Sequence, residues 1–301
     1  MPSYEDTLAR LAEEDERIVV MTAENRAAIR GLPGRLGDRF IDVGICEQTM
    51  IGAAAGLALR GRVPVCHALA TFLTLRAFEF IRTDVGIARL PVKLVGAVPG
   101  FLSEANGPTH QAIEDVALMR AIAGMQIVCP ADEAELLAAL PAVIAADAPC
   151  YLRFNALPAA VEHVAPFEMG RAEVLSEGGD VSLLTYGFML REAERARQHL
   201  EAQGVRVRLV NLRTLRPIDV RAVLRAATES KLVVTIEDHS LVGGLYSMVC
   251  EVLVANEVRA RVLPIALESG WFKPAMLKDV LAFERFDGAS IAARVIGALR
   301  A

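Results

Sequence analysis

The sequence predicts an α/β protein of two domains, each a mostly parallel sheet flanked by helices. Short apolar runs rich in Val, Ile and Leu alternate with segments of strong helix formers along most of the chain. These runs are continuous rather than alternating, which is typical of strands buried on both faces of a parallel sheet. A proline-containing segment, residues 158–170, interrupts the rhythm and is predicted to be a linker.

The first predicted domain spans residues 1–157. Apolar runs predict its strands over residues 17–23, 40–43, 63–69, 91–98, 126–128 and 150–154. Helix formers predict helices over residues 4–16, 72–88 and 113–122, with two more that begin near Cys46 and after the capping residue Asp132. Gly31, Gly34 and Gly37 have no strand leading into them, so they predict a flexible loop and not a dinucleotide site.

The second predicted domain spans residues 171–301. Its strands are expected over residues 180–186, 205–212, 231–237 and 262–266, with helices from about Leu190, Asp219 and Gly244. Gly243 and Gly244 open the last of these helices directly after a strand. Such a helix terminus can hold an anion, although a tight turn with close packing is the favoured interpretation.

Composition excludes several classes of protein. The net charge is −5 and Lys and Arg are scattered, so there is no basic stripe for nucleic acid. No apolar run reaches the roughly 18 residues of a membrane span, and no signal peptide is evident. The five cysteines lack C-x-x-C spacing and predict buried thiols in a reducing cytoplasm. A hydrophobic fraction of 53% with only 5% aromatics predicts an extensive apolar subunit interface.

One carboxylate, Glu47, stands at the junction of a predicted strand and a predicted helix. Gly44 breaks the strand, and Glu47 then falls in the first helical turn. Small residues follow, which would let another backbone approach closely: Gly52, Ala53, Ala55 and Gly56. The ordinary interpretation of Glu47 is a first-turn carboxylate, favourable by about 0.3–1 kcal/mol.

This segment resembles the cofactor-activating segment of transketolases and deoxyxylulose-phosphate synthases. The resemblance implies that Glu47 contacts the aminopyrimidine of thiamine diphosphate, whose N1′ needs a carboxylate partner. Residues 70–78, A-T-F-L-T-L-R-A-F, resemble the segment that stacks on this ring. Phe72 and Phe78 match its aromatic positions, and Leu75 replaces a further family aromatic. The alternative is that both phenylalanines belong to the core.

A second match is the loop N-G-P-T-H-Q, residues 106–111. The resemblance implies that His110 hydrogen-bonds the hydroxyl and carbonyl oxygens of a donor sugar. Asn106 stands where transketolases usually have Asp, and Val98 where they usually have a phosphate-holding histidine. Arg153 matches the family's phosphate-binding arginine. The ordinary alternatives are a solvent-facing loop histidine and a surface arginine.

The diphosphate half of such a site is missing from this sequence. No G-D-G segment with a later Asn occurs, so we expect no metal ligands here. The second half also resembles the transketolase C-terminal domain, at residues 211–219 and 235–245. The chain therefore resembles the second subunit of a split transketolase. A partner chain would hold Mg²⁺ and the diphosphate, in a heterotetramer that transfers a two-carbon ketol unit from a ketose to an aldehyde.

Three other functions stay open at this point. A deoxyxylulose-phosphate-synthase-like enzyme would decarboxylate pyruvate instead. The beta subunit of a 2-oxoacid dehydrogenase has a similar Glu segment, but the loop at residues 106–111 argues against it. A non-catalytic partner that binds nucleotide or another enzyme would not need Glu47 or His110, and both are present.

Overall fold

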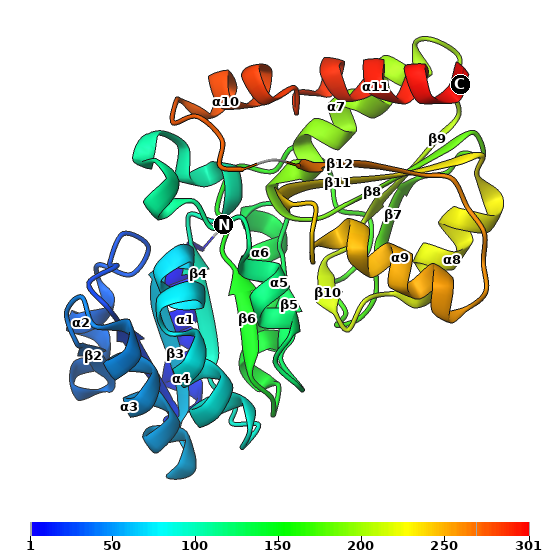
Figure 1. Ribbon diagram of the computed structural model, residues 1–301. Helices are drawn as coiled ribbons and strands as arrows, with labels where there is room; N and C mark the ends of the chain where they lie inside the picture. The colour runs from blue at the N-terminus through cyan, green and yellow to red at the C-terminus, as the bar shows by residue number, and fades with distance from the viewer. Residues whose placement is uncertain (1, 269, 301) are drawn as a thin grey trace.

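A computed structural model describes residues 2–268 and 270–300 and shows two sheets with helices on both faces (Figure 1). The first sheet has seven strands in the order β10-β5-β6-β4-β3-β1-β2, all parallel except β10, which runs antiparallel to β5. In chain order these strands are β1 (Ile18–Thr22), β2 (Phe40–Asp42), β3 (Val63–Leu69), β4 (Lys93–Ala97), β5 (Gln126–Val128), β6 (Cys150–Arg153) and β10 (Thr214–Arg216).

Helices cover both faces of this sheet because the buried strand residues alternate between two apolar clusters. Ile18 and Val20 of β1 pack with the cluster under α1 and α6, whereas Val19 and Met21 pack with the cluster under α3. The helices of this half are α1 (Tyr4–Glu14), α2 (Leu32–Leu36), α3 (Glu47–Leu59), α4 (Phe78–Phe80), α5 (Asp115–Arg120) and α6 (Glu133–Ala145).

The second sheet has five strands in the order β12-β11-β8-β9-β7, with β7 antiparallel to β9. Its strands are β7 (Glu173–Ser176), β8 (Val181–Thr185), β9 (Val207–Asn211), β11 (Leu232–Ser240) and β12 (Val262–Leu267). Figure 1 shows one pair of helices on each face: α7 (Leu190–Glu201) with α11 (Gly288–Arg300), and α8 (Val220–Glu229) with α9 (Leu245–Ala255). Helix α10 (Leu277–Glu284) precedes α11.

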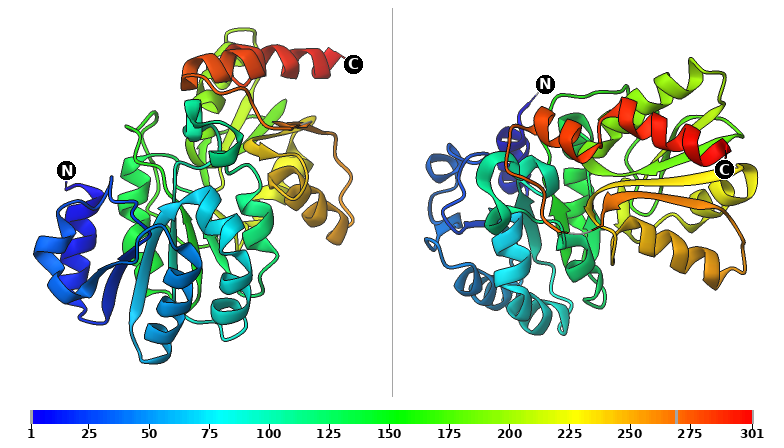
Figure 2. Two further views of the ribbon diagram at one scale, coloured as in Figure 1. Left: turned by 60° about the vertical axis from the view of Figure 1, so that its left-hand side comes forward. Right: turned by 45° about the horizontal axis from the view of Figure 1, so that its top comes forward.

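The two halves are joined by more than their linker. One buried apolar cluster contains Met50 and Met119 from the first half together with Val223 and Leu245 from the second. Strand β10 belongs by sequence to the second half, yet it completes the first sheet. Figure 2 shows the close approach of the two halves from two further directions. Residues at this contact are therefore positioned by both halves.

Most expected elements are confirmed, with informative exceptions. Strands β3 and β5 have the predicted bounds, and Asp132 caps α6 by accepting from the Glu135 N–H at 3.0 Å. The expected glycine loop instead contains the short helix α2. Strands β7 and β10 and helices α10 and α11 were not expected from the sequence.

The single helix expected over residues 72–88 is a second exception. It is interrupted, with π-helical turns at Phe72–Arg76 and Ile81–Gly86 on either side of α4. This wider winding changes which side chains share a face, because hydrogen bonds then join residues five apart.

Composition predicted buried cysteines and no membrane span, and the structure bears on both. Cys66, Cys129 and Cys150 are buried as expected, but Cys46 is exposed. Within the described residues, no helix combines the length and apolar character that crossing a membrane requires.

Candidate active site

The carboxyl edge of the first sheet forms a pocket of about 280 Å³. The parallel strands β1, β2 and β3 end together there, so the residues that follow them meet although they are distant in sequence. Ligands of open α/β sheets bind at this edge. The pocket is lined by Ala23, Glu24, Asn25, Ile45, Glu47, Leu69 and Phe72.

Glu47 is the first residue of α3, and its side chain is only 2% exposed. Gly44, with φ of 72°, makes the left-handed turn between β2 and this helix, a conformation that glycine adopts without strain. The Asp42 carboxylate accepts from the Gly44 N–H at 2.9 Å and fixes the turn. This turn therefore delivers a buried carboxylate to an otherwise largely apolar wall.

Arg76, which no sequence motif indicated, compensates the charge of Glu47. Its Nη1 donates to Glu47 Oε2 at 2.8 Å, and its guanidinium lies 4.2 Å from the centroid of the Phe72 ring. The Arg76 side chain remains 39% exposed. Arg76 is the one charged residue of the segment at residues 70–78, but its partner is 29 positions away in the sequence.

His110 lies on the connection after β4 and reaches the same edge of the sheet. Its ring meets the Phe72 ring edge-on, with centroids 5.0 Å apart, and its Nδ1 lies 3.0 Å from the Thr109 hydroxyl. Asn106 is exposed on the same connection. Val98 begins it with φ of 56°, which is unusual for a β-branched residue. The structure thus brings Glu47, Phe72 and His110 together.

Two of the expected stacking residues are not part of this pocket. Phe78 packs against the apolar cluster shared by the two halves, and Leu75 is 42% exposed. Phe78 follows Phe72 by six residues, and only residues three or four apart share a helix face, so the two side chains lie on different faces. In the structure, Phe72 is therefore the only one of the three predicted stacking residues that lines the pocket.

Arg153 is held inside the chain by two carboxylates. Its side chain is 2% exposed and lies between two carboxylates, Asp115 at 2.9 Å and Asp238 at 2.7 Å. It is therefore not a surface arginine. Because both carboxylates bind its guanidinium inside the chain, the structure gives no support to a substrate phosphate site there.

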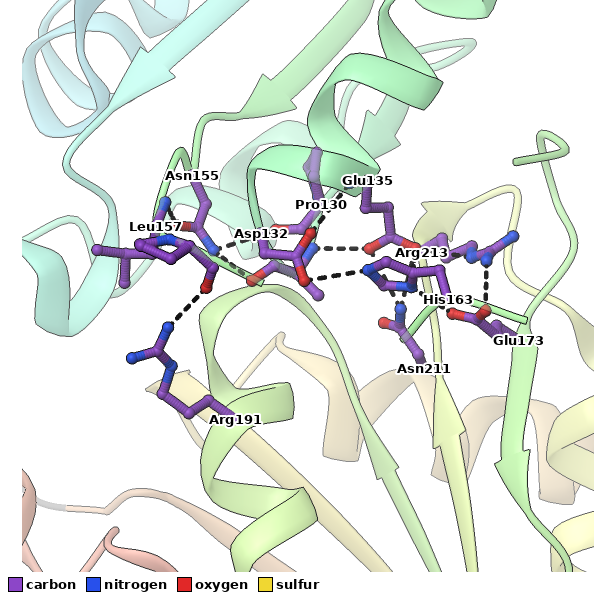
Figure 3. A network of polar contacts seen from close by, with 12 residues as sticks. Pro130, Asp132, Glu135, Asn155, Leu157, His163, Glu173, Arg191, Asn211 and Arg213 are labelled. Carbon is purple, nitrogen blue, oxygen red and sulfur yellow. Dashed lines mark hydrogen bonds and ion pairs between the residues drawn. The ribbon is translucent and has the colours of Figure 1, made fainter. Parts of the chain in front are cut away.

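A second charged cluster joins the linker to both halves (Figure 3). His163 lies between Asp132, 3.0 Å from its Nε2, and Glu173, 2.7 Å from its Nδ1. Arg213 pairs with Glu135 at 2.7 Å and with Glu173 at 2.8 Å. Together with the Arg153 group, these residues form what we call the interdomain seam.

Within the described residues, Glu135, His163 and Glu173 are the only group close enough to share a metal ion. Burial alone would lower the pKa of His163, but Asp132 and Glu173 outweigh it and raise that pKa to about 10. The imidazolium and Arg213 therefore already neutralise much of the carboxylate charge. This cluster is an internal ion network rather than a metal centre.

The helix terminus opened by Gly243 and Gly244 also holds an internal carboxyl group, that of Glu237. The Glu237 carboxylate accepts from the N–H groups of Leu245 at 2.6 Å and Tyr246 at 2.9 Å. A Cβ at Gly244 would lie only 2.1 Å from Glu237 Oε2. The favoured interpretation from the sequence, a tight turn with close packing, is the one that agrees with these contacts.

Comparison with protein families covers almost the whole chain. The family described as "Transketolase, pyrimidine binding domain" matches residues 2–157, and "Transketolase, C-terminal domain" matches residues 170–291. The chain belongs to the transketolase family. The resemblance drawn from the Glu47 segment and the loop at residues 106–111 is thereby confirmed at the level of the family.

Individual relatives include both split and long transketolase-like chains. The chain is 41% identical to "6-deoxy-6-sulfo-D-fructose transketolase subunit SqwH" of Clostridium sp. (strain MSTE9), over 84% of this chain and 80% of the relative. It is 36% identical to "1-deoxy-D-xylulose-5-phosphate synthase" of Synechococcus sp. (strain JA-3-3Ab), over 98% of this chain but only 47% of the synthase.

Among solved structures, one described as "Split gene transketolase, inactive beta4 tetramer" superposes with a TM-score of 0.87 at 33% identity. The match covers 99% of this chain and 96% of that one. The transketolase-family fold of both halves is therefore shown.

Proposed function

We propose that this transketolase-family chain is one of two subunits of a thiamine diphosphate-dependent transketolase and supplies the pyrimidine half of its active site. The reaction is transfer of a two-carbon ketol unit from a ketose donor to an aldehyde acceptor. The observation that carries the proposal is the buried Glu47 carboxylate, set in a pocket whose wall includes the Phe72 ring.

The residues of the pocket fit an aminopyrimidine, which has apolar faces and a polar edge. Ile45, Leu69 and Phe72 offer apolar surface, and Glu47 offers the one carboxylate within it that is nearly inaccessible to water. Glu47 would hydrogen-bond N1′ of the ring and hold a proton there. It would thus act as an acid–base group on the cofactor rather than on the substrate. When bound, thiamine diphosphate supplies the carbon nucleophile of the reaction.

The partner chain would hold the diphosphate and Mg²⁺, for which this sequence has no G-D-G segment. The outward face of α3 supports the presence of a partner. A Cβ at Gly56 would meet open space, and one at Gly52 would meet only Asp84 Oδ2 at 3.9 Å among the described residues. Mid-helix glycine costs about 1 kcal/mol relative to alanine, and no close contact among the described residues requires it at these two positions. We propose a heterotetramer of two copies of each chain.

His110 and Asn106 are the proposed donors to the ketose, because both lie on the connection that reaches the pocket. Val98 offers no donor where the family usually has a phosphate-holding histidine. The Clostridium relative is named for a sugar that carries a sulfonate. We therefore propose that the far end of the substrate bears no phosphate, or a different anion.

A second candidate function is carboligation after pyruvate decarboxylation. The specific observation in its favour is that 98% of the chain matches a deoxyxylulose-phosphate synthase at 36% identity. The two reactions differ in the donor, since one breaks a ketose carbon–carbon bond and the other releases carbon dioxide from pyruvate.

The test combines this chain with a partner chain that carries the G-D-G segment, in the presence of thiamine diphosphate and Mg²⁺. We expect ketol transfer from a ketose donor by the mixture and none by either chain alone. Turnover by the isolated chain, with contamination excluded, would contradict the two-subunit proposal. Release of carbon dioxide from pyruvate by the mixture, without ketol transfer, would favour the second candidate.

A further inference from the structure

The connection that carries Asn106 and His110 is built more elaborately than a surface loop. We call residues 98–112 the substrate loop; it leaves β4 and returns toward α5. Its base is closed by a hydrogen bond from the Gly100 N–H to the Ala112 carbonyl at 3.0 Å. Between these points it makes two short 3₁₀ segments, Gly100–Asn106 and Pro108–His110. Loops normally run over the surface, so the buried parts of this one need an explanation.

Phe101 is the first buried anchor of the substrate loop. Its side chain is 0% exposed, although it follows β4 of the first sheet. Its ring packs edge-on against Phe272, with centroids 5.0 Å apart, and against Phe286, with centroids 4.9 Å apart. Both partners lie in the second half of the chain, so the apolar core of that half encloses the root of the loop.

Gln111 is the second anchor and directly follows His110. Its buried side-chain Nε2 donates to the carbonyl of Phe272 at 2.8 Å, across 161 positions of sequence. In the described part of the chain, its Oε1 has no hydrogen-bond partner. Two residues further on, the Ser240 N–H donates to the Ile113 carbonyl at 2.8 Å. The end of the loop next to His110 is therefore fixed to the second half.

The start of the loop rests on the interdomain seam. Gly100 has φ of 54°, and a Cβ there would lie 1.9 Å from Asp238 Oδ2. The same carboxylate oxygen accepts from the Phe101 N–H at 3.3 Å. Only glycine allows the backbone to come this close to Asp238. The Asp238 carboxylate, which is paired with Arg153, therefore also supports the start of the loop.

We propose that the second half of the chain is the template that holds the substrate loop, with Phe101 and Gln111 as positioning residues for His110. The proposal rests on the proposed function, since it gives His110 a donor sugar to meet. His110 faces Phe72 at the pocket while the next residue is tied to Phe272. A shift of about 1 Å in a positioning group can lower a rate by roughly 100-fold, so such anchoring matters for transfer.

Three variants test this proposal in the full chain. Gln111→Met keeps the length of the side chain and removes its hydrogen bond. Phe286→Leu removes a ring from the second half without touching the pocket. Phe188→Leu is the matched control, because Phe188 and Phe286 are both 3% exposed and lie in the same apolar cluster, but of the two it is the Phe286 ring that stacks edge-on with Phe101. Urea unfolding checks that the two leucine variants lose similar stability.

The first measurement is hydrogen–deuterium exchange across residues 98–112 in the isolated chain. We expect faster exchange, by about tenfold or more, in Gln111→Met and Phe286→Leu, and no change in Phe188→Leu. The second measurement, on the assembled enzyme, is kcat/KM for the ketose donor beside the Kd for thiamine diphosphate. We expect kcat/KM to fall by roughly 10- to 100-fold in the two test variants, with the Kd within about twofold of wild type.

The two measurements separate the failure of this proposal from the failure of the proposed function. Unchanged exchange in both test variants would overturn the template role, whatever the activity. Faster exchange with unchanged kcat/KM would overturn the positioning role of Phe101 and Gln111. A wild-type assembly without ketol transfer would contradict the proposed function alone, and the exchange measurement would still decide whether the second half orders the loop.

Discussion

The pocket and the interdomain seam hold similar side chains in opposite circumstances. In the pocket, one buried carboxylate, Glu47, is met by one partly exposed arginine, Arg76. In the seam, Arg153 and Arg213 are each bound by two carboxylates and are almost inaccessible to water. Glu47 can therefore exchange Arg76 for another hydrogen-bond partner, whereas the arginines of the seam cannot exchange theirs.

This difference shows that burial and strong pKa perturbation also occur outside the proposed active site. The raised pKa of His163, at about 10, and that of Glu237, which burial raises to about 8, both belong to internal networks. Perturbed groups do gather at functional sites, but structural ion networks perturb them too. An accessible pocket next to a single carboxylate is the better guide in this molecule.

The largest expected effect tests the pocket. Glu47→Gln in the assembled enzyme should slow turnover by roughly 10²–10⁴-fold, the usual contribution of a positioned acid–base group. The free energy of unfolding should hardly change, because the shape is kept and Arg76 retains access to water. Proton exchange at C2 of the bound cofactor, followed by NMR, reports on Glu47 directly. Glu79→Gln, an exposed carboxylate nearby, is the control, and wild-type exchange in Glu47→Gln would remove Glu47 from its proposed role.

The converse effect is expected in the seam. Arg153→Leu leaves Asp115 and Asp238 buried without their cation, and breaking a buried pair in this way costs about 3–5 kcal/mol. Urea unfolding measures the loss. The control is Arg206→Leu, since Arg206 is exposed and its pair with Asp180 should contribute little to the free energy of unfolding. An Arg153 variant of normal stability with weakened binding of phosphorylated substrate would restore the phosphate role expected from the sequence.

A smaller, pH-dependent effect is expected at His163. Because its folded pKa is raised from 6.5 to about 10, its stabilisation is complete below about pH 6.5 and is lost as pH rises toward 10. Although burial opposes it, His163 and Arg213 lower the pKa of Glu173 from 4.5 to about 2. The contribution of Glu173 is therefore complete above about pH 4.5 and is lost as pH falls toward 2.

The variant His163→Gln tests the contribution of the His163 charge to the free energy of unfolding. We expect it to lower the free energy of unfolding by about 1.5–3 kcal/mol between pH 4.5 and 6.5, the range for a hydrogen bond to a charged group. The difference from wild type should shrink as pH rises toward 10. A difference that stays constant up to pH 10 would mean that His163 acts through packing rather than through its charge.

Sequence reasoning was most successful where the signal is local. Continuous apolar runs located the buried parallel strands, and Asp132 was visible as a helix cap. Strand β10 was missed because its partner, β5, lies in the other half of the chain, and no local pattern reveals such a pairing. The same limit explains the candidate site. Glu47, Phe72 and His110 were found through family motifs, whereas Arg76 and the burial of Arg153 depend on contacts between distant segments.

The last expected effect concerns the start of the substrate loop, where Val98 holds φ of 56°. A non-glycine residue in the left-handed region costs about 1–2 kcal/mol, and histidine tolerates that region better than valine does. The family's usual histidine would therefore suit this backbone at least as well, so the valine is not explained by conformation. We therefore attribute the valine to the substrate, because its apolar side chain offers no hydrogen-bond donor to a phosphate.

We therefore expect Val98→His to fold with at least wild-type stability and to shift the substrate preference. One charge-assisted hydrogen bond contributes about 1.5–3 kcal/mol, or roughly 10- to 150-fold in affinity. The measurement compares kcat/KM for ribose 5-phosphate and ribose as acceptors, with wild type and Val98→His, and Val98→Gly controls for relief of backbone strain. If wild type already favours the phosphate by well over about 100-fold, near 2.7 kcal/mol, and Val98→His adds nothing, another group binds the phosphate and the proposal is wrong. A shift in Val98→His alone would instead show that the side chain at position 98 sets the preference between the two acceptors.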